Sequence, residues 1–360
     1  MDGDVERAEP RVLAADEPAI AEAASILAAG GLVGMPTETV YGLACHAFDP
    51  RAAAKVFANK GRPSFDPLIV HVAKASDAAT LVSGSRGFAP LGPALAGLVT
   101  RLAEAFWPGA LTMVLPKPDA VPGIVTAGLE TVGVRVPAHP VAQSLIAALG
   151  ERTGTTGAVA APSANVFGGV SPSRAEHVRV ACDLVLDGGP CATGVESTVV
   201  RPMEDGTAAV LRLGGVSVEA LAEALGEANV RVISASADDH EASTGLASPG
   251  TTLRHYAPRT PMRLVADRAA LLATMGAESS AGRRVGGLGM GWGSRPASPR
   301  GGDALFEDLS TTGDLTEAAA NLFAAMHRLD AAGLDAIVAQ AVPEIGLGRA
   351  INDRLRRASR

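Results

Sequence analysis

The sequence predicts an α/β protein with two domains, a twisted mixed sheet followed by a smaller βαβ domain. With 360 residues, the chain is long for one core but suits two. Short apolar runs of strand length occur among helical patterns without strict alternation, which favours a mixed sheet over a doubly wound one. Residues 234–261 are rich in Ser, Thr, Ala, Gly and Pro, a composition typical of a linker.

These signals divide the chain into four segments. Residues 1–15 are expected to form an N-terminal tail and residues 16–233 the main domain. Residues 234–261 are the expected interdomain linker, and residues 262–360 the small C-terminal α/β domain.

Hydrophobic periodicity and turn residues place the elements of the main domain. The helical pattern of residues 20–29 ends at Gly30, and Asp49 followed by Pro50 predicts the N-cap and first turn of a helix that ends near Asn59. Further helices are expected over 94–106, 141–149 and 218–225, and strands over 32–35, 67–72, 111–115, 131–136, 157–161, 184–186, 197–201 and 209–213.

The C-terminal domain shows the same mixture of signals. Strands are expected over 262–265, 284–288 and 336–339, and helices over 268–275, 315–331 and the last residues of the chain. The run 286–293 is rich in Gly but does not match the dinucleotide-binding glycine pattern, so it predicts only a flexible loop.

Composition argues against several classes of function. The net charge of −7 and the 3% of aromatic residues disfavour a protein that grips a nucleic-acid backbone or stacks single-stranded bases. Three cysteines without a C-x-x-C pair disfavour a disulfide framework or a zinc site. The polar N-terminus and the lack of an apolar run of ~20 residues predict a cytoplasmic protein with no membrane segment.

The segment Lys60-Gly61-Arg62-Pro63 places two cations on a constrained backbone beyond a predicted helix. A guanidinium binds phosphate through two hydrogen bonds, and an ammonium supplies a mobile charge, so the pair suits a nucleotide triphosphate. The alternative is that the cations stabilise the C-terminus of the helix. That alternative accounts for Lys60 better than for Arg62.

Other polar residues interrupt or follow buried strands, where α/β proteins place ligand contacts. Thr37, Glu38 and Thr39 follow the strand 32–35, and an ordinary turn capped by threonine is an equal alternative. Arg135 lies within an apolar strand, which indicates either a substrate carboxylate or a buried ion pair. Ser163, Asn165, Ser197 and Arg212 complete a set that suggests one pocket for an anionic ligand. For the segment with Ser163 and Asn165, an ordinary Pro-Ser turn is the slightly favoured alternative.

The first domain contains a series of short sequence blocks: PTETVYGL (36–43), KGRP (60–63), PLIVHV (67–72), WPGALT (107–112), TVGVRVPAHP (131–140), APSAN (161–165), GVESTVV (194–200) and LRLGG (211–215). Their order and spacing resemble the YrdC-like domain of a known family, the L-threonylcarbamoyladenylate synthases of the long, two-domain form. SPGTTLRHYAP (248–258) is similar to the family's interdomain linker, and PEIGLGRAINDRLRRAS (343–359) to the end of its Rossmann-like C-terminal domain.

The resemblance implies a reaction in which L-threonine, bicarbonate and ATP give L-threonylcarbamoyl-AMP and pyrophosphate. The product feeds threonylcarbamoyl-adenosine modification of tRNA, and separate tRNA threonylcarbamoyl transferase proteins act downstream. Direct tRNA binding is then weak or absent. Mg²⁺ is implied with ATP, held mostly by phosphate oxygens and water.

The resemblance also implies residue roles. Lys60 and Arg62 would be catalytic and would hold the triphosphate with Arg212. Thr112, Ser163, Asn165 and Tyr256 would contact ATP, and Tyr256, with His255 nearby, would close the site from the linker. Thr37, His71, Arg135 and Ser197 would hold L-threonine, with Arg135 on its carboxylate.

One residue departs from the family's pattern. Asp66 precedes the strand 67–72 where the family usually has Asn, so a negative charge lies near the expected triphosphate. It would either weaken ATP binding or face Mg²⁺. Two other functions stay open beside the synthase: an RNA-binding module of the YrdC-like type without catalysis, and a carbamoyl transferase with another acceptor, although the zinc-finger-like cysteines of the latter are missing here.

Overall fold

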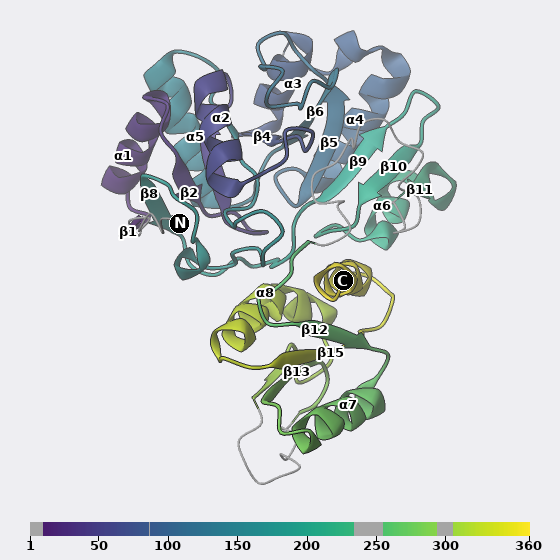
Figure 1. The fold of residues 1–360 in the computed structure, drawn as a ribbon. Coiled ribbons are helices and arrows are strands. Elements are labelled where there is room, and N and C mark those ends of the chain that lie inside the picture. The colour runs from purple at the N-terminus through teal and green to yellow at the C-terminus, as the bar shows by residue number, and fades with distance from the viewer. Residues whose placement is uncertain (1–9, 86, 234–254, 294–304) are drawn as a thin grey trace.

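The computed structural model describes residues 10–85, 87–233, 255–293 and 305–360. Within these residues, two sheets form two units that lie one beside the other (Figure 1). The expected fold class, a mixed α/β sheet followed by a smaller parallel βαβ unit, is confirmed. The predicted linker residues 234–254 lie outside the described residues, whereas residues 255–261 are described.

The large sheet mixes parallel and antiparallel neighbours and carries helices on its faces (Figure 1). Its spatial order is β1 (Arg11–Ala14), β8 (Leu184–Asp187), β2 (Val33–Met35), β3 (Gly42–His46), β7 (Ala158–Ala160), β4 (Ile69–Val72), β6 (Thr131–Arg135), β5 (Leu111–Pro116), β9 (Thr198–Pro202), β10 (Ala208–Arg212) and β11 (Val230–Val232). Its helices are α1 (Glu17–Ala28), α2 (Pro50–Lys60), α3 (Ala75–Ser83), α4 (Pro93–Phe106), α5 (Pro140–Thr153) and α6 (Val218–Leu225).

The small unit is a parallel sheet between two layers of helix. Its strands lie in the order β12 (Met262–Val265), β15 (Ala336–Gln340), β13 (Val285–Gly289) and β14 (Phe306–Asp308). Helices α8 (Leu315–Ala331) and α9 (Gly348–Ala358) lie on the side that faces the large unit, and α7 (Arg268–Ser280) lies on the far side (Figure 1).

Local sequence signals set several ends of these elements correctly. The Asp49 side chain accepts a hydrogen bond from the Arg51 amide at the start of α2, and Pro50 is the first helical residue. Gly61 ends α2 in the left-handed conformation, with a φ of 62° that suits glycine. The predicted N-cap and the end of this helix near the cation pair are therefore confirmed.

One expectation about local structure is wrong, and one strand was not predicted. Residues 11–14 of the predicted tail form β1, which pairs in parallel with β8, and such a short, largely exposed edge strand has little apolar alternation to reveal it. Residues 42–46, for which no element was predicted, form β3. The predicted strand 284–288 is confirmed as β13, which includes the first residues of the Gly-rich run, and a Cβ on Gly287 would lie 2.5 Å from Phe306.

The two units share one hydrophobic cluster. Val195 from the large unit packs in the same cluster as Phe323 of α8. Gly194, with a φ of 72°, lies directly against α8, since a Cβ there would stand 2.3 Å from the Ala319 carbonyl oxygen. The segment that precedes Ser197 is therefore fixed by the small unit.

No helix within the described residues has the length and apolar character that a membrane span requires. Cys45 and Cys191 are buried free thiols, and Cys182 is a half-buried one.

Two histidines stack across the junction of the units. The rings of His177 and His327 lie 4.0 Å apart, and the His327 ring nitrogen Nε2 lies 3.1 Å from the Ser171 carbonyl oxygen. Burial lowers the pKa of His177 to about 3 and also lowers the pKa of His327, and nearby charges such as that of Arg179 act in the same direction. Both imidazoles are therefore neutral near pH 7.

The histidine pair predicts a loss of stability in acid. A histidine whose pKa falls from 6.5 to about 3 on folding contributes fully above pH 6.5, and this contribution is lost as the pH falls toward 3. The wild type should lose unfolding free energy between pH 7 and pH 5. The variant His177→Phe keeps an aromatic ring against His327, and we expect it to lose about 1 kcal/mol less, after allowance for solvent screening. Urea unfolding at both pH values measures it. An equal loss in the wild type and the variant would contradict this origin.

Candidate active site

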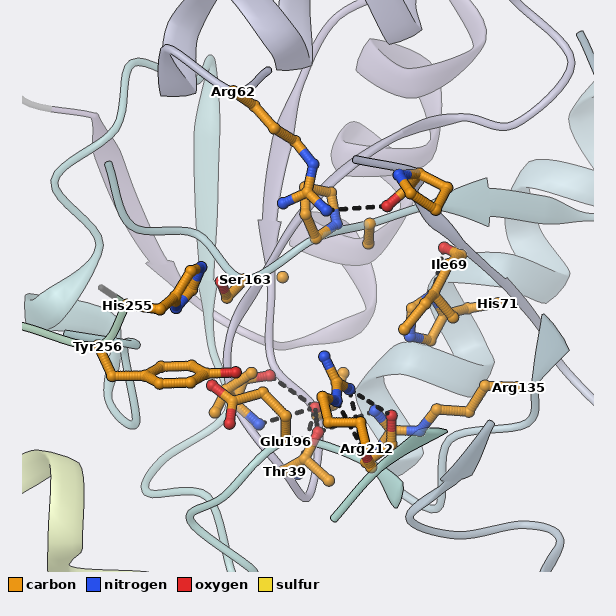
Figure 2. Close-up of a pocket in the computed structure, with 17 residues that line it drawn as sticks. Thr39, Arg62, Ile69, His71, Arg135, Ser163, Glu196, Arg212, His255 and Tyr256 are labelled. Carbon is orange, nitrogen blue, oxygen red and sulfur yellow. Dashed lines mark hydrogen bonds between the residues drawn. The ribbon is translucent and has the colours of Figure 1, made fainter. Parts of the chain in front are cut away.

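A pocket in the large unit is lined by loops and strand ends that are distant in sequence (Figure 2). Arg62 enters it from one side, Arg135 and Arg212 from another, and His255 and Tyr256 lie along its edge. The pocket brings together these predicted residues: Thr37, Arg62, His71, Arg135, Ser163, Ser197, Arg212 and Tyr256. Lys60, Asp66, Thr112 and Asn165 do not line it.

Thr37 begins a tight turn at the pocket. Its hydroxyl donates to the Val40 carbonyl oxygen at 2.6 Å and accepts from the amides of Thr39 and Val40. The turn that served as the alternative explanation is therefore present, and the pocket contact is present as well. Thr39 also lines the pocket, although the sequence did not distinguish it from an ordinary turn residue.

Arg135, at the end of β6, is buried with a carboxylate partner in this structure. Its Nη2 donates to Glu38 at 2.6 Å, its Nη1 to the Thr39 hydroxyl at 2.8 Å, and its Nε to the Gly109 carbonyl oxygen. Burial would raise the pKa of Glu38, but the charge and hydrogen bond of Arg135 outweigh it and lower that pKa. Of the two explanations drawn from the sequence, the buried ion pair is observed, and Arg135 also faces the pocket.

Lys60 lies behind the pocket wall. Its ammonium donates to the carbonyl oxygens of Ser163, at 2.5 Å, and of Asn165. The side chain is 1% exposed, and burial, followed by the charge of Arg62, lowers its pKa well below the usual value. In this structure Lys60 therefore holds the loop 161–165 in place, and the simple helix-terminus explanation does not describe it.

Asn165 turns back into its own loop. Its Nδ2 donates to the carbonyl oxygens of Val166 and Gly169. Within the described residues its Oδ1 has no hydrogen-bond partner. Asn165 therefore lies outside the pocket lining with its amide nitrogen engaged by the loop, and its contact with the nucleotide stays a prediction.

Asp66 is paired with Arg62. Their side chains meet at 2.8 Å, and Arg62 also donates through Nε to the Asp66 carbonyl oxygen and through Nη2 to the Pro67 carbonyl oxygen. Both residues are buried, and burial raises the pKa of Asp66 against the pull of Arg62. Asp66 thus contacts Arg62 and lies outside the pocket lining, so the ligand contact expected of it is indirect.

This pairing predicts the effect of removing the charge of Asp66. In Asp66→Asn the amide oxygen still accepts from Arg62, while one negative charge near the pocket is lost. For ATP, the ligand that the sequence resemblance implies, we expect KM to fall about 3- to 10-fold in this variant, since a close charge acts strongly in a buried setting. Initial rates at varied ATP measure this, and Asp119→Asn, the same charge change at an exposed position, is the matched control. A rise in KM would show that the carboxylate assists ATP binding.

Thr112, on β5, acts through Ser197. The two hydroxyl oxygens lie 2.7 Å apart, and Arg212 donates to the Ser197 hydroxyl at 3.1 Å and to its carbonyl oxygen at 2.9 Å. Thr112 is fully buried outside the pocket lining. Thr112 thus orients Ser197 in this structure, and its contact with ATP stays a prediction.

His71, on β4, is neutral. Its Nδ1 lies 3.1 Å from the Ile69 carbonyl oxygen. Burial, together with the charge of Arg135, lowers its pKa to about 3. A neutral imidazole in the pocket can hydrogen-bond a ligand without adding a positive charge.

Tyr256 and Glu196 form the edge of the pocket next to the small unit. Tyr256 is 1% exposed and has a φ of 62°, which is unusual for a residue with a side chain. Glu196 lines the pocket, and its carboxylate accepts from the Ser171 hydroxyl at 2.5 Å and from Arg354 at 2.9 Å. The sequence pointed to the block 194–200 but not to Glu196, because its partners lie far along the chain.

Family models match nearly the whole chain. Residues 25–214 match the Sua5/YciO/YrdC family, described as Telomere recombination, and residues 216–360 match the family described as Threonylcarbamoyl-AMP synthase, C-terminal domain.

Individual proteins are similar over the same span. A threonylcarbamoyl-AMP synthase of Pyrococcus abyssi is 37% identical over 351 residues, which cover 94% of this chain and 93% of that protein. One of Bacillus subtilis is 38% identical over 353 residues, 96% of this chain and 94% of that protein. The crystal structure of P. abyssi Sua5 complexed with L-threonine superposes with a TM-score of 0.80 and 35% identity, and covers 97% of this chain and 96% of that one.

Proposed function

The chain belongs to the threonylcarbamoyl-AMP synthase family, and we propose that its pocket makes L-threonylcarbamoyl-AMP from L-threonine, bicarbonate and ATP, with release of pyrophosphate. The product supplies the threonylcarbamoyl group for tRNA modification. High coverage of named synthases, including a structure with L-threonine, argues against a module that only binds RNA.

The observation that carries this proposal is the charge of the pocket. Three buried arginines, Arg62, Arg135 and Arg212, face it. Glu196 is the one carboxylate among its described lining residues, and that carboxylate is already engaged by Ser171 and Arg354. Asp66 and Glu38 pair with Arg62 and Arg135 from behind the lining, so the cavity surface itself presents guanidinium groups. Such a surface suits a ligand with several negative charges, such as ATP.

The proposed chemistry has two steps. The amine of L-threonine attacks bicarbonate and forms a carbamate with loss of water. A carbamate oxygen then attacks the α-phosphorus of ATP, and the bond from that phosphorus to the bridging oxygen breaks as pyrophosphate leaves. Such a displacement depends on positioning and charge neutralisation rather than on a protein nucleophile.

We assign the L-threonine side of the pocket to four residues. Arg135 would bind the carboxylate of L-threonine, and its hydrogen bond to Glu38 would either break or persist beside this new contact. Thr37 and Ser197 would offer hydroxyl groups to the substrate. Neutral His71 would accept a hydrogen bond from the amine without placing a positive charge beside it.

We assign the triphosphate to Arg62 and Arg212, with Ser163 and Tyr256 as further ATP contacts. Four residues would act indirectly. Lys60 fixes the loop that carries Ser163, and Asn165 donates to carbonyl oxygens within that loop. Thr112 orients Ser197, and Asp66 pairs with Arg62. His255 and Tyr256, next to the predicted linker, would exclude water from the reacting atoms.

Mg²⁺ is expected to arrive with ATP. Within the described residues, no group of three or more His, Cys, Asp or Glu is placed to hold a metal ion, and the Glu196 oxygens already accept two hydrogen bonds. The described residues thus offer no dedicated cage, and in our proposal phosphate oxygens and water would hold the ion and shield the charge of the triphosphate.

Pyrophosphate release tests the function directly. We expect release from ATP only when L-threonine and bicarbonate are both present, and the omission of each in turn is the control. Release that ignores L-threonine would contradict the proposal. Filter binding of tRNA at two salt concentrations tests the RNA-binding alternative, for which we expect weak binding. Downstream transferase proteins and a cytoplasmic location stay predictions.

A further inference from the structure

Arg354, on α9 of the small unit, is a wholly buried cation at the edge of the pocket. Its exposed fraction is 0%. Its Nε donates to Glu196 at 2.9 Å, and its Nη1 donates to Asp353 at 2.8 Å. Its guanidinium carbon also lies 4.9 Å from the centre of the Tyr256 ring. Two of these three partners, Glu196 and Tyr256, line the pocket.

The first partner, Glu196, requires this cation. Its two carboxylate oxygens accept from Ser171 and from Arg354. Without Arg354, an uncompensated negative charge would stand in the wall of a pocket that otherwise presents arginines. The Glu196 carboxylate, whose charge Arg354 now balances, would then repel an anionic nucleotide.

The second partner, Tyr256, is held by the small unit. Two helices of the small unit contact it: its ring stacks on Phe323 of α8 at 5.8 Å, and the Arg354 guanidinium of α9 lies 4.9 Å from the ring centre. A cation over a tyrosine ring is attractive and restricts the ring's orientation. Because Tyr256 also has an unusual positive φ, contacts with both helices help keep it at the pocket edge.

We propose that Arg354 is a positioning residue of the active site, through which the small domain neutralises Glu196 and orients Tyr256 for ATP binding. The small domain then supports two residues of the pocket lining from outside that lining. Packing alone does not explain a cation here, because buried ion pairs seldom stabilise a protein more than apolar residues of similar size. Nη2 of Arg354 also lacks a hydrogen-bond partner within the described residues, which adds to the cost of burying it.

The test compares Arg354→Met with Arg356→Met, a matched change on the same helix. Arg356 is an exposed residue that pairs with Glu344 and contacts neither Glu196 nor Tyr256 in the described structure. We expect Arg354→Met to raise KM for ATP at least about 30-fold, from loss of a buried charge partner. We expect Arg356→Met to stay within about 2-fold of the wild type, as exposed pairs usually do.

A second change separates positioning from general support of the fold. In Arg354→Met/Glu196→Gln the unpaired negative charge is removed, and KM for ATP should return to within about 5-fold of the wild type. A merely structural role predicts no recovery, because the double variant has lost more contacts than the single one. No recovery, or equal effects of the two arginine changes, would overturn the proposal.

Two measurements keep the result interpretable. If circular dichroism shows that Arg354→Met does not fold, Arg354→Lys replaces it in the test. We expect Arg354→Lys to raise KM for ATP by a smaller factor, because the charge beside Glu196 is kept. An unchanged KM would overturn the proposal. ATP affinity, measured by calorimetry without L-threonine, reports on Arg354 even if the wild type fails to release pyrophosphate. This inference rests on the proposed function, but the two can fail separately. Missing pyrophosphate release would contradict the function, whereas an unchanged ATP affinity in the Arg354 variant would contradict the inference.

Discussion

Replacement of Arg135 by methionine is expected to lower kcat/KM for L-threonine by about 10²- to 10³-fold, the loss typical of a truncated buried charge partner. Arg135 is 4% exposed and faces the pocket with its guanidinium already oriented by Thr39 and Gly109. A preoriented guanidinium binds a substrate carboxylate with little further loss of freedom. Initial rates at varied L-threonine and saturating ATP measure the effect.

The same change should also destabilise the protein, and a double variant separates the two effects. Arg135→Met leaves the Glu38 carboxylate buried without its partner, which typically costs about 3–5 kcal/mol. Arg135→Met/Glu38→Gln removes that charge, so most of the unfolding free energy should return while activity stays low. If activity returned with stability, Arg135 would serve only as the ion-pair partner of Glu38 and would not bind L-threonine.

The sequence predicted elements best where the deciding interactions are local. The start of α2 follows from the Asp49 side chain and Pro50, and its end follows from the left-handed Gly61. The order of the strands depends on distant pairings, such as that of β1 with β8, that no local pattern contains. Edge strand β1 was missed for this reason. Strand β3 pairs with β2, which precedes it directly in the chain, and with the distant β7, and its pairing with β7 was likewise not visible in the local pattern.

The candidate site shows the same division between local and distant information. Motifs identified which residues surround the pocket, since eight predicted residues line it. They did not show which side chains touch one another. The Lys60 ammonium meets carbonyl oxygens more than 100 positions away, at Ser163 and Asn165, and Glu196 meets Arg354 158 positions away. Whether a buried cation meets a ligand or another part of the protein depends on such distant partners.

The other change with a large expected effect is Arg62→Met, which we expect to lower kcat/KM for ATP by about 10²- to 10³-fold. Arg62 is 8% exposed, and the carbonyl oxygens of Asp66 and Pro67 hold its Nε and Nη2, so the guanidinium is fixed at the pocket before ATP binds. A fixed cation needs no reorganisation to stabilise charge on a triphosphate. The split between KM and kcat, from rates at varied ATP, shows whether Arg62 acts on binding or on the displacement.

Two further variants give this prediction its control. Arg51→Met makes the same change at an exposed position of α2, the helix that precedes Arg62, and should leave ATP kinetics unchanged. Arg62→Lys keeps the charge but cannot reproduce the two backbone contacts of the guanidinium, so we expect an intermediate loss of about 10-fold. If lysine restored full activity, charge alone would suffice. If methionine left the ATP dependence unchanged, the triphosphate would lie elsewhere, and the excess of arginines in this pocket would need a different ligand.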